Sequence, residues 1–140
     1  MTTRGFALIF GVVFGLVGIA GFVPSLVTAV HGPHPPLAVE TGYGLLLGLF
    51  PINLLHNLVH VLFGLWGLIG SRSIVASKFY ARSVAVIYAV LSIAGLVPGL
   101  DTLFGLTPLF GNDVWLHALL ALIAAYFGWL HREVGPASRM

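Results

Sequence analysis

The chain has 140 residues, of which 59% are hydrophobic and only 7% are charged. A soluble domain carries charges on about a quarter of its residues, so most of the exterior of this chain must face lipid. The net charge of +2 includes no basic cluster, which argues against nucleic acid as a partner. The absence of cysteine excludes disulfides, thiolate metal sites and a cysteine nucleophile. We expect a single membrane domain over residues 1–140.

Four apolar stretches match the length of about 20 residues that a helix needs to cross a bilayer. The first contains Gly11 and Gly15, a pair of small residues suited to close helix contact, and should bend or end near Pro24. The second should begin with Pro51 in its first turn. We expect spans over residues 5–29, 51–70, 79–97 and 113–130.

The basic residues predict how these spans are oriented. In a four-span arrangement all of them fall on one side, whereas the acidic residues other than Glu133 fall on the other. Because positive charge is retained in the cytoplasm, both termini and the turn between the second and third spans should be cytoplasmic. We expect a multi-pass protein of a bacterial inner or photosynthetic membrane, with a loosely ordered tail over residues 131–140. The basic residues are Arg4, Arg72, Lys78, Arg82, Arg132 and Arg139.

The two halves of the chain resemble each other, which predicts an internal duplication. GIAGFVPSL at residues 18–26 recurs as SIAGLVPGL at residues 92–100, and LHNL at residues 55–58 recurs as LHAL at residues 116–119. Two spans per half give both halves the same orientation, so a pseudo-two-fold axis should lie along the membrane normal. The expected fold is an all-α integral membrane four-helix bundle built from two tandem two-span repeats.

Polar residues interrupt the apolar runs of the second and fourth spans. At helical spacing, Asn53, His56 and His60 share one face of the second span, and Asp113 and His117 share one face of the fourth. Imidazoles are costly in lipid, so both faces should point into the bundle. The duplication makes His56 and His117 equivalent positions, and we expect the five side chains to converge.

Three interpretations of this cluster remain open. His56 and His117 could ligate a tetrapyrrole, either haem or chlorophyll, as paired imidazoles in helix bundles do. Alternatively, His56, His60, His117 and Asp113 could bind a divalent metal. In the third interpretation the polar groups only hydrogen-bond across the bundle and specify its packing. HNLVH lacks the glutamate of the HExxH pattern, so metal-dependent hydrolysis is not supported.

Two acidic residues of the loops could support the cluster. Glu40 and Asp101 occupy equivalent positions in the two repeats. Either carboxylate could accept a hydrogen bond from a histidine that binds a metal.

The segment NLLHNLVHVLFGLWGL resembles a bacterial family of small four-span membrane proteins defined only as a domain of unknown function. The matching pattern is Asn-x-x-His-Asn-x-x-His followed by a glycine-rich helix. The resemblance implies the four-span fold but no activity, substrate or cofactor. The residues that carry it are Asn53, His56, Asn57, His60, Gly64 and Gly67.

No nucleophile elbow, phosphate loop or catalytic carboxylate pair is present in the sequence. We therefore expect a non-enzymatic accessory or scaffold protein that contacts the lipid bilayer and either other membrane subunits or further copies of itself. The alternative is a cofactor-binding bundle that uses the histidine cluster.

Overall fold

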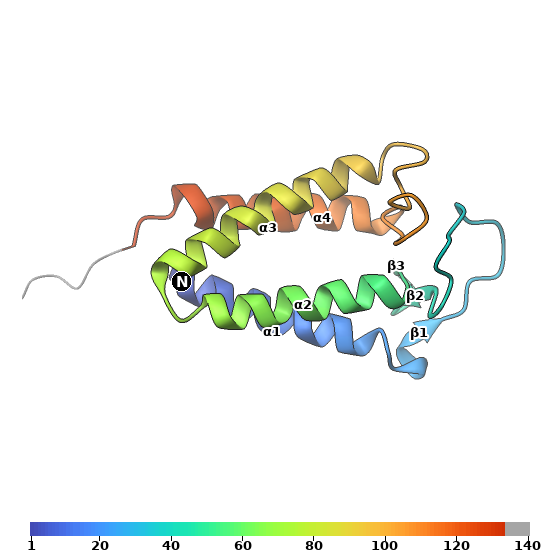
Figure 1. Cartoon of the computed structure of the whole chain (residues 1–140), viewed down its shortest axis with the longest axis horizontal. Helices are drawn as coiled ribbons and strands as arrows, with labels where there is room; N and C mark the ends of the chain where they lie inside the picture. The colour runs from blue at the N-terminus through green and yellow to red at the C-terminus, as the bar shows by residue number, and fades with distance from the viewer. Residues whose placement is uncertain (134–140) are drawn as a thin grey trace, which may run out of the picture.

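Four helices form the body of the protein in a computed structural model that describes residues 1–133 (Figure 1). The first two helices pack together as one pair and the last two as another. The N-terminus lies at the end of the bundle where a short turn joins the second helix to the third, and the strands lie at the opposite end. The helices are α1 (Thr3–Ala20), α2 (Leu54–Gly70), α3 (Ile74–Ala94) and α4 (Asn112–Ala125), and α4 continues as a π-helix, η2 (Tyr126–Leu130).

Three of these helices are long and apolar enough to span a membrane, namely α1, α3, and α4 together with η2. The remaining helix, α2, is equally apolar but has 17 residues. Large apolar side chains point outward from every helix, including Leu8, Leu62, Val90 and Leu122. A water-facing surface of this kind would be costly, so the structure indicates a membrane protein.

Three helices have boundaries that differ from the sequence-based prediction. α3 covers Ile74–Ala94, whereas the expected third span covered residues 79–97. α1 ends at Ala20, and Pro24 begins a short 3-10 helix, η1 (Pro24–Leu26), so residues 21–29 do not extend the first span. The prediction that Pro51 lies in the first turn of α2 is wrong, because Pro51 lies in a strand and α2 begins at Leu54. Residue Asn53 accounts for that boundary, since its side chain accepts a hydrogen bond from His56 N and caps the helix.

A small antiparallel sheet, absent from the all-α prediction, lies at the strand end of the bundle. It consists of β1 (Val27–Thr28), β2 (Gly44–Leu46) and β3 (Phe50–Ile52), in the order β1-β2-β3. Pro51 pairs with Leu45 on the outer strand β3, where a missing N–H is tolerated. Backbone groups near lipid need internal partners, and the sheet provides them for loop segments that cannot be helical.

The α1–α2 pair packs through glycines at van der Waals distance. A Cβ atom placed on Gly11 would lie 2.7 Å from the backbone nitrogen of Leu68, and one on Gly64 would lie 2.6 Å from the backbone nitrogen of Gly15. A Cβ on Gly15 itself would meet nothing within 4 Å. Of the predicted glycine pair, Gly11 therefore faces α2 directly, whereas Gly15 contributes only its backbone.

An aromatic core joins the two helix pairs. Phe14 stacks on Tyr88 with ring centroids 5.3 Å apart, and Phe6 stacks on Phe127 at 4.8 Å. These rings are almost completely buried, as is Tyr80. The core lies in the middle of the bundle and toward the end where the N-terminus lies. The strand end is left for the polar side chains of α2 and α4.

The sequence predicts a loosely ordered tail over residues 131–140. Most of it, residues 134–140 with Arg139, lies outside the described residues.

Candidate functional site

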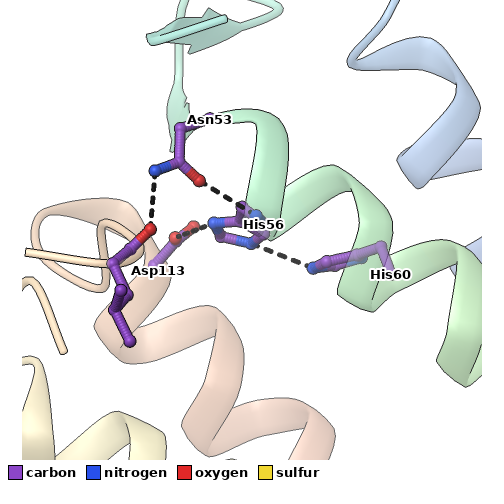
Figure 2. A network of polar contacts seen from close by, with 5 residues as sticks. Asn53, His56, His60 and Asp113 are labelled. Atoms are coloured by element: carbon purple, nitrogen blue, oxygen red, sulfur yellow. Dashed lines mark hydrogen bonds and ion pairs between the residues drawn. The ribbon is translucent and has the colours of Figure 1, made fainter. Parts of the chain in front are cut away.

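Two histidines one turn apart on α2 contact each other directly. His56 Nε2 lies 3.0 Å from His60 Nε2 (Figure 2). Two ring nitrogens at this distance share one proton, so one imidazole donates and the other accepts. The pair thus fixes the tautomer of each ring relative to the other.

Helix α4 brings two further polar side chains to this pair. His56 Nδ1 lies 3.8 Å from Asp113 Oδ2, and the ring centroids of His56 and His117 are 6.4 Å apart. One possible ligand atom from each of His56, Asp113 and His117 lies within 4.8 Å of the other two. These three residues and His60 are only 2–8% exposed. We call this set of four residues the polar cluster.

Asn53 does not join the polar cluster but holds the surrounding segments in place. Its Oδ1 accepts from His56 N at 2.9 Å (Figure 2). Its Nδ2 donates to the carbonyls of Val39 and Leu106 at 2.8 Å each. The residue is completely buried. Both functions of the amide are therefore satisfied, and Asn53 fastens the loops before α2 and α4 to the first turn of α2.

A cavity of about 180 Å³ lies beside the polar cluster. His56, His60 and His117 form part of its wall, together with Tyr88, Thr107 and several aliphatic side chains. The loop before α4 covers it through Leu103, which adopts a left-handed conformation with φ of 45°. Left-handed backbone is costly for leucine. This loop is held in place by Gly105 O, which accepts hydrogen bonds from Ala38 N and Val39 N of the loop before α2.

Four buried atoms of the polar cluster have no hydrogen-bond partner of good geometry within residues 1–133, although the backbone of Pro108 lies close to the His56 ring. They are His56 Nδ1, His60 Nδ1, His117 Nδ1 and Asp113 Oδ2. Buried polar side-chain atoms in proteins nearly always have a partner, because an unpaired one costs about 1–3 kcal/mol. Water in the adjoining cavity or a bound group can supply the missing partners.

The cavity of about 180 Å³ is smaller than sites for drug-sized ligands, which occupy about 300–1,000 Å³. A haem or chlorophyll held by these histidines would therefore need the surrounding helices and loop to move apart. The donor set of two imidazoles and one carboxylate suits a divalent transition metal. Tetrahedral bonds of about 2.1 Å place two ligand atoms about 3.4 Å apart. The possible ligand atoms of the three residues lie within 4.8 Å of one another, so the distance between any two of them would need to shorten by about 1.4 Å at most.

The two loop carboxylates expected to support the cluster do not reach it. Glu40 is exposed to solvent. Asp101 accepts a hydrogen bond from Gly99 N at 3.1 Å, within its own loop. Asp113 is the carboxylate beside His56 in the described chain.

Tyr88 is a neighbour of the cluster that the sequence analysis missed. It lies on α3, and its ring packs edge-on against His117 with centroids 5.0 Å apart. Tyr80, Val84 and Tyr88 recur at intervals of four and are all buried. That spacing could have identified Tyr88 as an inward-facing residue, although not as a neighbour of a histidine.

The comparisons with known proteins identify a family but no function. No curated protein and no solved structure matches the chain. Residues 4–130 match the model of a family described as a domain of unknown function, DUF4383. This match covers nearly the whole described chain, including every residue of the polar cluster, and the protein therefore belongs to the DUF4383 family.

Proposed function

We propose that this protein is a non-enzymatic membrane protein that binds one divalent transition metal ion through His56, Asp113 and His117. The observation that carries the proposal is that one possible ligand atom of each residue lies within 4.8 Å of the other two, in a buried place where each residue also has an unpartnered polar atom. A metal ion would occupy the lone pairs that the fold leaves without partners. Imidazole and carboxylate together suit Zn²⁺, Cu²⁺, Fe²⁺ or Ni²⁺.

The contact between the two α2 histidines suggests a separate role for each. If His56 Nδ1 binds the ion, its Nε2 carries the proton and donates to His60 Nε2, 3.0 Å away. A ligating histidine commonly donates its second N–H to a partner that fixes its orientation. We therefore assign His60 to positioning His56 rather than to the metal itself.

Asp113 is well placed to supply the negative charge of the site. It lies in the first turn of α4, where the N-terminal end of the helix dipole favours an anion. One carboxylate and two neutral imidazoles would leave a bound divalent ion with a net charge of +1. The remaining coordination position would face the cavity, where water can complete a tetrahedral shell.

The accessory or scaffold function expected from the sequence is the competing proposal. It assigns the polar cluster to helix packing alone, and in that case its polar atoms should pair with one another. The unpartnered atoms of His56, His117 and Asp113 favour the metal-binding proposal, whereas His60 Nδ1 stays without a partner in either case.

We also propose that α2 spans the membrane with the other helices, and that both termini are cytoplasmic in a bacterial membrane. The support is the distribution of the basic residues, which gather at the end of the bundle away from the strands. A single cysteine introduced within residues 31–38 should react with a membrane-impermeant reagent from outside intact cells. Labelling only after the cells are opened would contradict this orientation.

The duplication remains part of this proposal. Gly21 and Gly95, at matching places in the two repeats, cap α1 and α3 with nearly the same backbone conformation, φ −64° and −62°. Superposing residues 5–70 on residues 79–130 should place His56 on His117. A large difference in their depth would contradict the duplication.

Metal content of the purified protein tests the proposed function. The protein should be purified in mild detergent, equilibrated with each candidate ion, freed of excess and measured by elemental mass spectrometry. One ion per chain is expected for the natural protein and for His31→Ala, which removes an exposed loop histidine. His56→Ala and His117→Ala should lose it. Equal content in all four proteins, or none in the natural protein, would contradict the proposal.

A further inference from the structure

Arg82 of α3 lies against the end of η2 in a defined geometry. Its Nε donates to Gly128 O at 2.9 Å, and its guanidinium carbon lies 5.8 Å from the centre of the Trp129 ring. Gly128 belongs to the last turn, where carbonyls lack partners within the helix. The guanidinium is thus oriented by two contacts, while within residues 1–133 its Nη groups make no hydrogen bond. They remain available to an anion.

An apolar groove of about 450 Å³ begins beside the same tryptophan. It runs between α3 and α4, and small side chains such as Ala85, Ala89, Ala118 and Ala125 make it hollow. Ser92 lines it too, but its hydroxyl donates to Val114 O at 2.8 Å and is already satisfied. The groove therefore offers a long molecule an apolar surface with a cation at one end.

We propose that this groove and Arg82 bind one anionic phospholipid of the bilayer, with an acyl chain in the groove and its phosphate against Arg82. The charge is at the correct place for a headgroup, because Lys78 lies one turn before Arg82 at the end of the bundle where Arg4 and Arg72 also lie. Basic pockets between membrane helices are typical sites for anionic headgroups. Free phosphate would leave the groove without a function, and an apolar helix would leave Arg82 without an anion.

Fluorescence quenching can measure this binding directly, because Trp129 lines the site. The protein should be studied with Trp66 and Trp115 changed to phenylalanine, so that Trp129 is the only tryptophan and can be excited apart from the tyrosines. It is reconstituted into phosphatidylcholine vesicles that contain phosphatidylglycerol brominated on its acyl chains, and compared with vesicles containing brominated phosphatidylcholine at the same fraction. Stronger quenching by the brominated phosphatidylglycerol is expected, since bromine quenches only at short range.

Three variants separate the two parts of the site. Arg82→Gln should lower the preference for phosphatidylglycerol about fivefold, the effect of one basic residue near a membrane surface. Arg72→Gln removes the same charge from the α2–α3 turn and should leave the preference nearly unchanged. Ala89→Phe fills the groove but keeps Arg82, and it should reduce quenching by both brominated lipids. The melting temperature of each variant should be measured alongside, because Arg82→Gln also removes the hydrogen bond to Gly128 O.

Several results would overturn the proposal. Equal quenching by the two brominated lipids would show that the headgroup is not recognised. An equal loss for Arg72→Gln and Arg82→Gln would show general attraction to the surface rather than a site. Unchanged quenching in Ala89→Phe would exclude an acyl chain in the groove. A cross-linked dimer that Ala89→Phe disperses would show that a second copy of the chain occupies it.

Discussion

His56 Nδ1 lies 3.8 Å from Asp113 Oδ2, and neither atom has a hydrogen-bond partner of good geometry in the described chain. The two residues come from α2 and α4, the second members of the two helix pairs. At this distance the atoms are too far apart for a hydrogen bond, yet both are buried. A shared ion would satisfy both atoms at once, and this relationship is the basis of the predictions on metal binding.

His60 should tune metal affinity without being required for it. His60→Phe removes the acceptor of the His56 Nε2 proton, and loss of such a partner typically weakens binding by about 10–100-fold. His60→Gln keeps an acceptor and should recover much of that affinity. Competition with a chromophoric chelator measures both constants. A complete loss of binding in His60→Phe would instead make His60 a ligand, and an unchanged constant would remove it from the site.

Asn53 should contribute to stability through two separable functions. Asn53→Ala removes the N-cap of α2 and orphans the carbonyls of Val39 and Leu106, so we expect a loss of about 2–4 kcal/mol in the free energy of unfolding. Asn53→Asp keeps the capping oxygen but not the donor to the two carbonyls. It should unfold between the natural protein and Asn53→Ala in a denaturant titration monitored by circular dichroism.

A loss in Asn53→Asp that equals or exceeds the loss in Asn53→Ala would show that the cap contributes little. In that case the loop contacts, together with repulsion between the new carboxylate and the two carbonyls, would account for the whole effect.

The α1–α2 interface should distinguish two glycines of one helix. Gly11→Ala places a methyl group 2.7 Å from the backbone nitrogen of Leu68, and such overpacking typically costs about 1–3 kcal/mol. Gly15→Ala meets nothing within 4 Å and should be neutral or stabilising by up to about 1 kcal/mol. Unfolding in detergent, followed by tryptophan fluorescence, measures both. Equal destabilisation by the two changes would contradict the observed packing.

Glu133 should make a pH-dependent link between the two ends of the chain. Its Oε1 accepts from Thr3 N at 2.8 Å, and hydrogen bonding from Thr3 lowers the pKa of Glu133 below its ordinary value of 4.5. A lowered folded-state pKa means that the contact stabilises fully above about pH 4.5 and loses its effect as the pH falls through the folded value. Glu133→Gln should therefore melt below the natural protein at pH 7, and the difference should vanish in acid.

A constant difference between Glu133→Gln and the natural protein across this pH range would contradict the titration of Glu133. Hydrogen exchange at Thr3 N offers a local check, because the amide should exchange faster once the carboxylate is protonated.

The sequence predicted helices and shared faces better than it predicted loop structure. Hydropathy placed four apolar segments, and helical spacing placed His56 and Asp113 on inward faces, because both signals depend only on neighbouring residues. The role of Asn53 was not predictable in the same way. Its partners Val39 and Leu106 are 14 and 53 residues away, so nothing near it in the chain indicates that it fastens two loops, although an asparagine just before a helix is a recognised cap.

The sheet and the cavity were invisible for related reasons. Leu45 and Pro51 pair only because a turn with positive φ at Leu47 and Gly48 reverses the chain, and apolar loop residues carry no clear alternation over three positions. The room available for a cofactor likewise depends on a volume, which is set by side chains from three helices and a loop. Residue types and their spacing do not report that volume.

The most direct test of the account is an anomalous difference map of the metal-loaded protein, collected at the absorption edge of the bound ion. We predict one strong peak within about 2.0–2.2 Å of a nitrogen of His56, a nitrogen of His117 and an oxygen of Asp113, and its disappearance in crystals of His56→Ala. A map with no peak among these three residues, or with its peak at the loop histidines His31 and His34, would contradict the central claim.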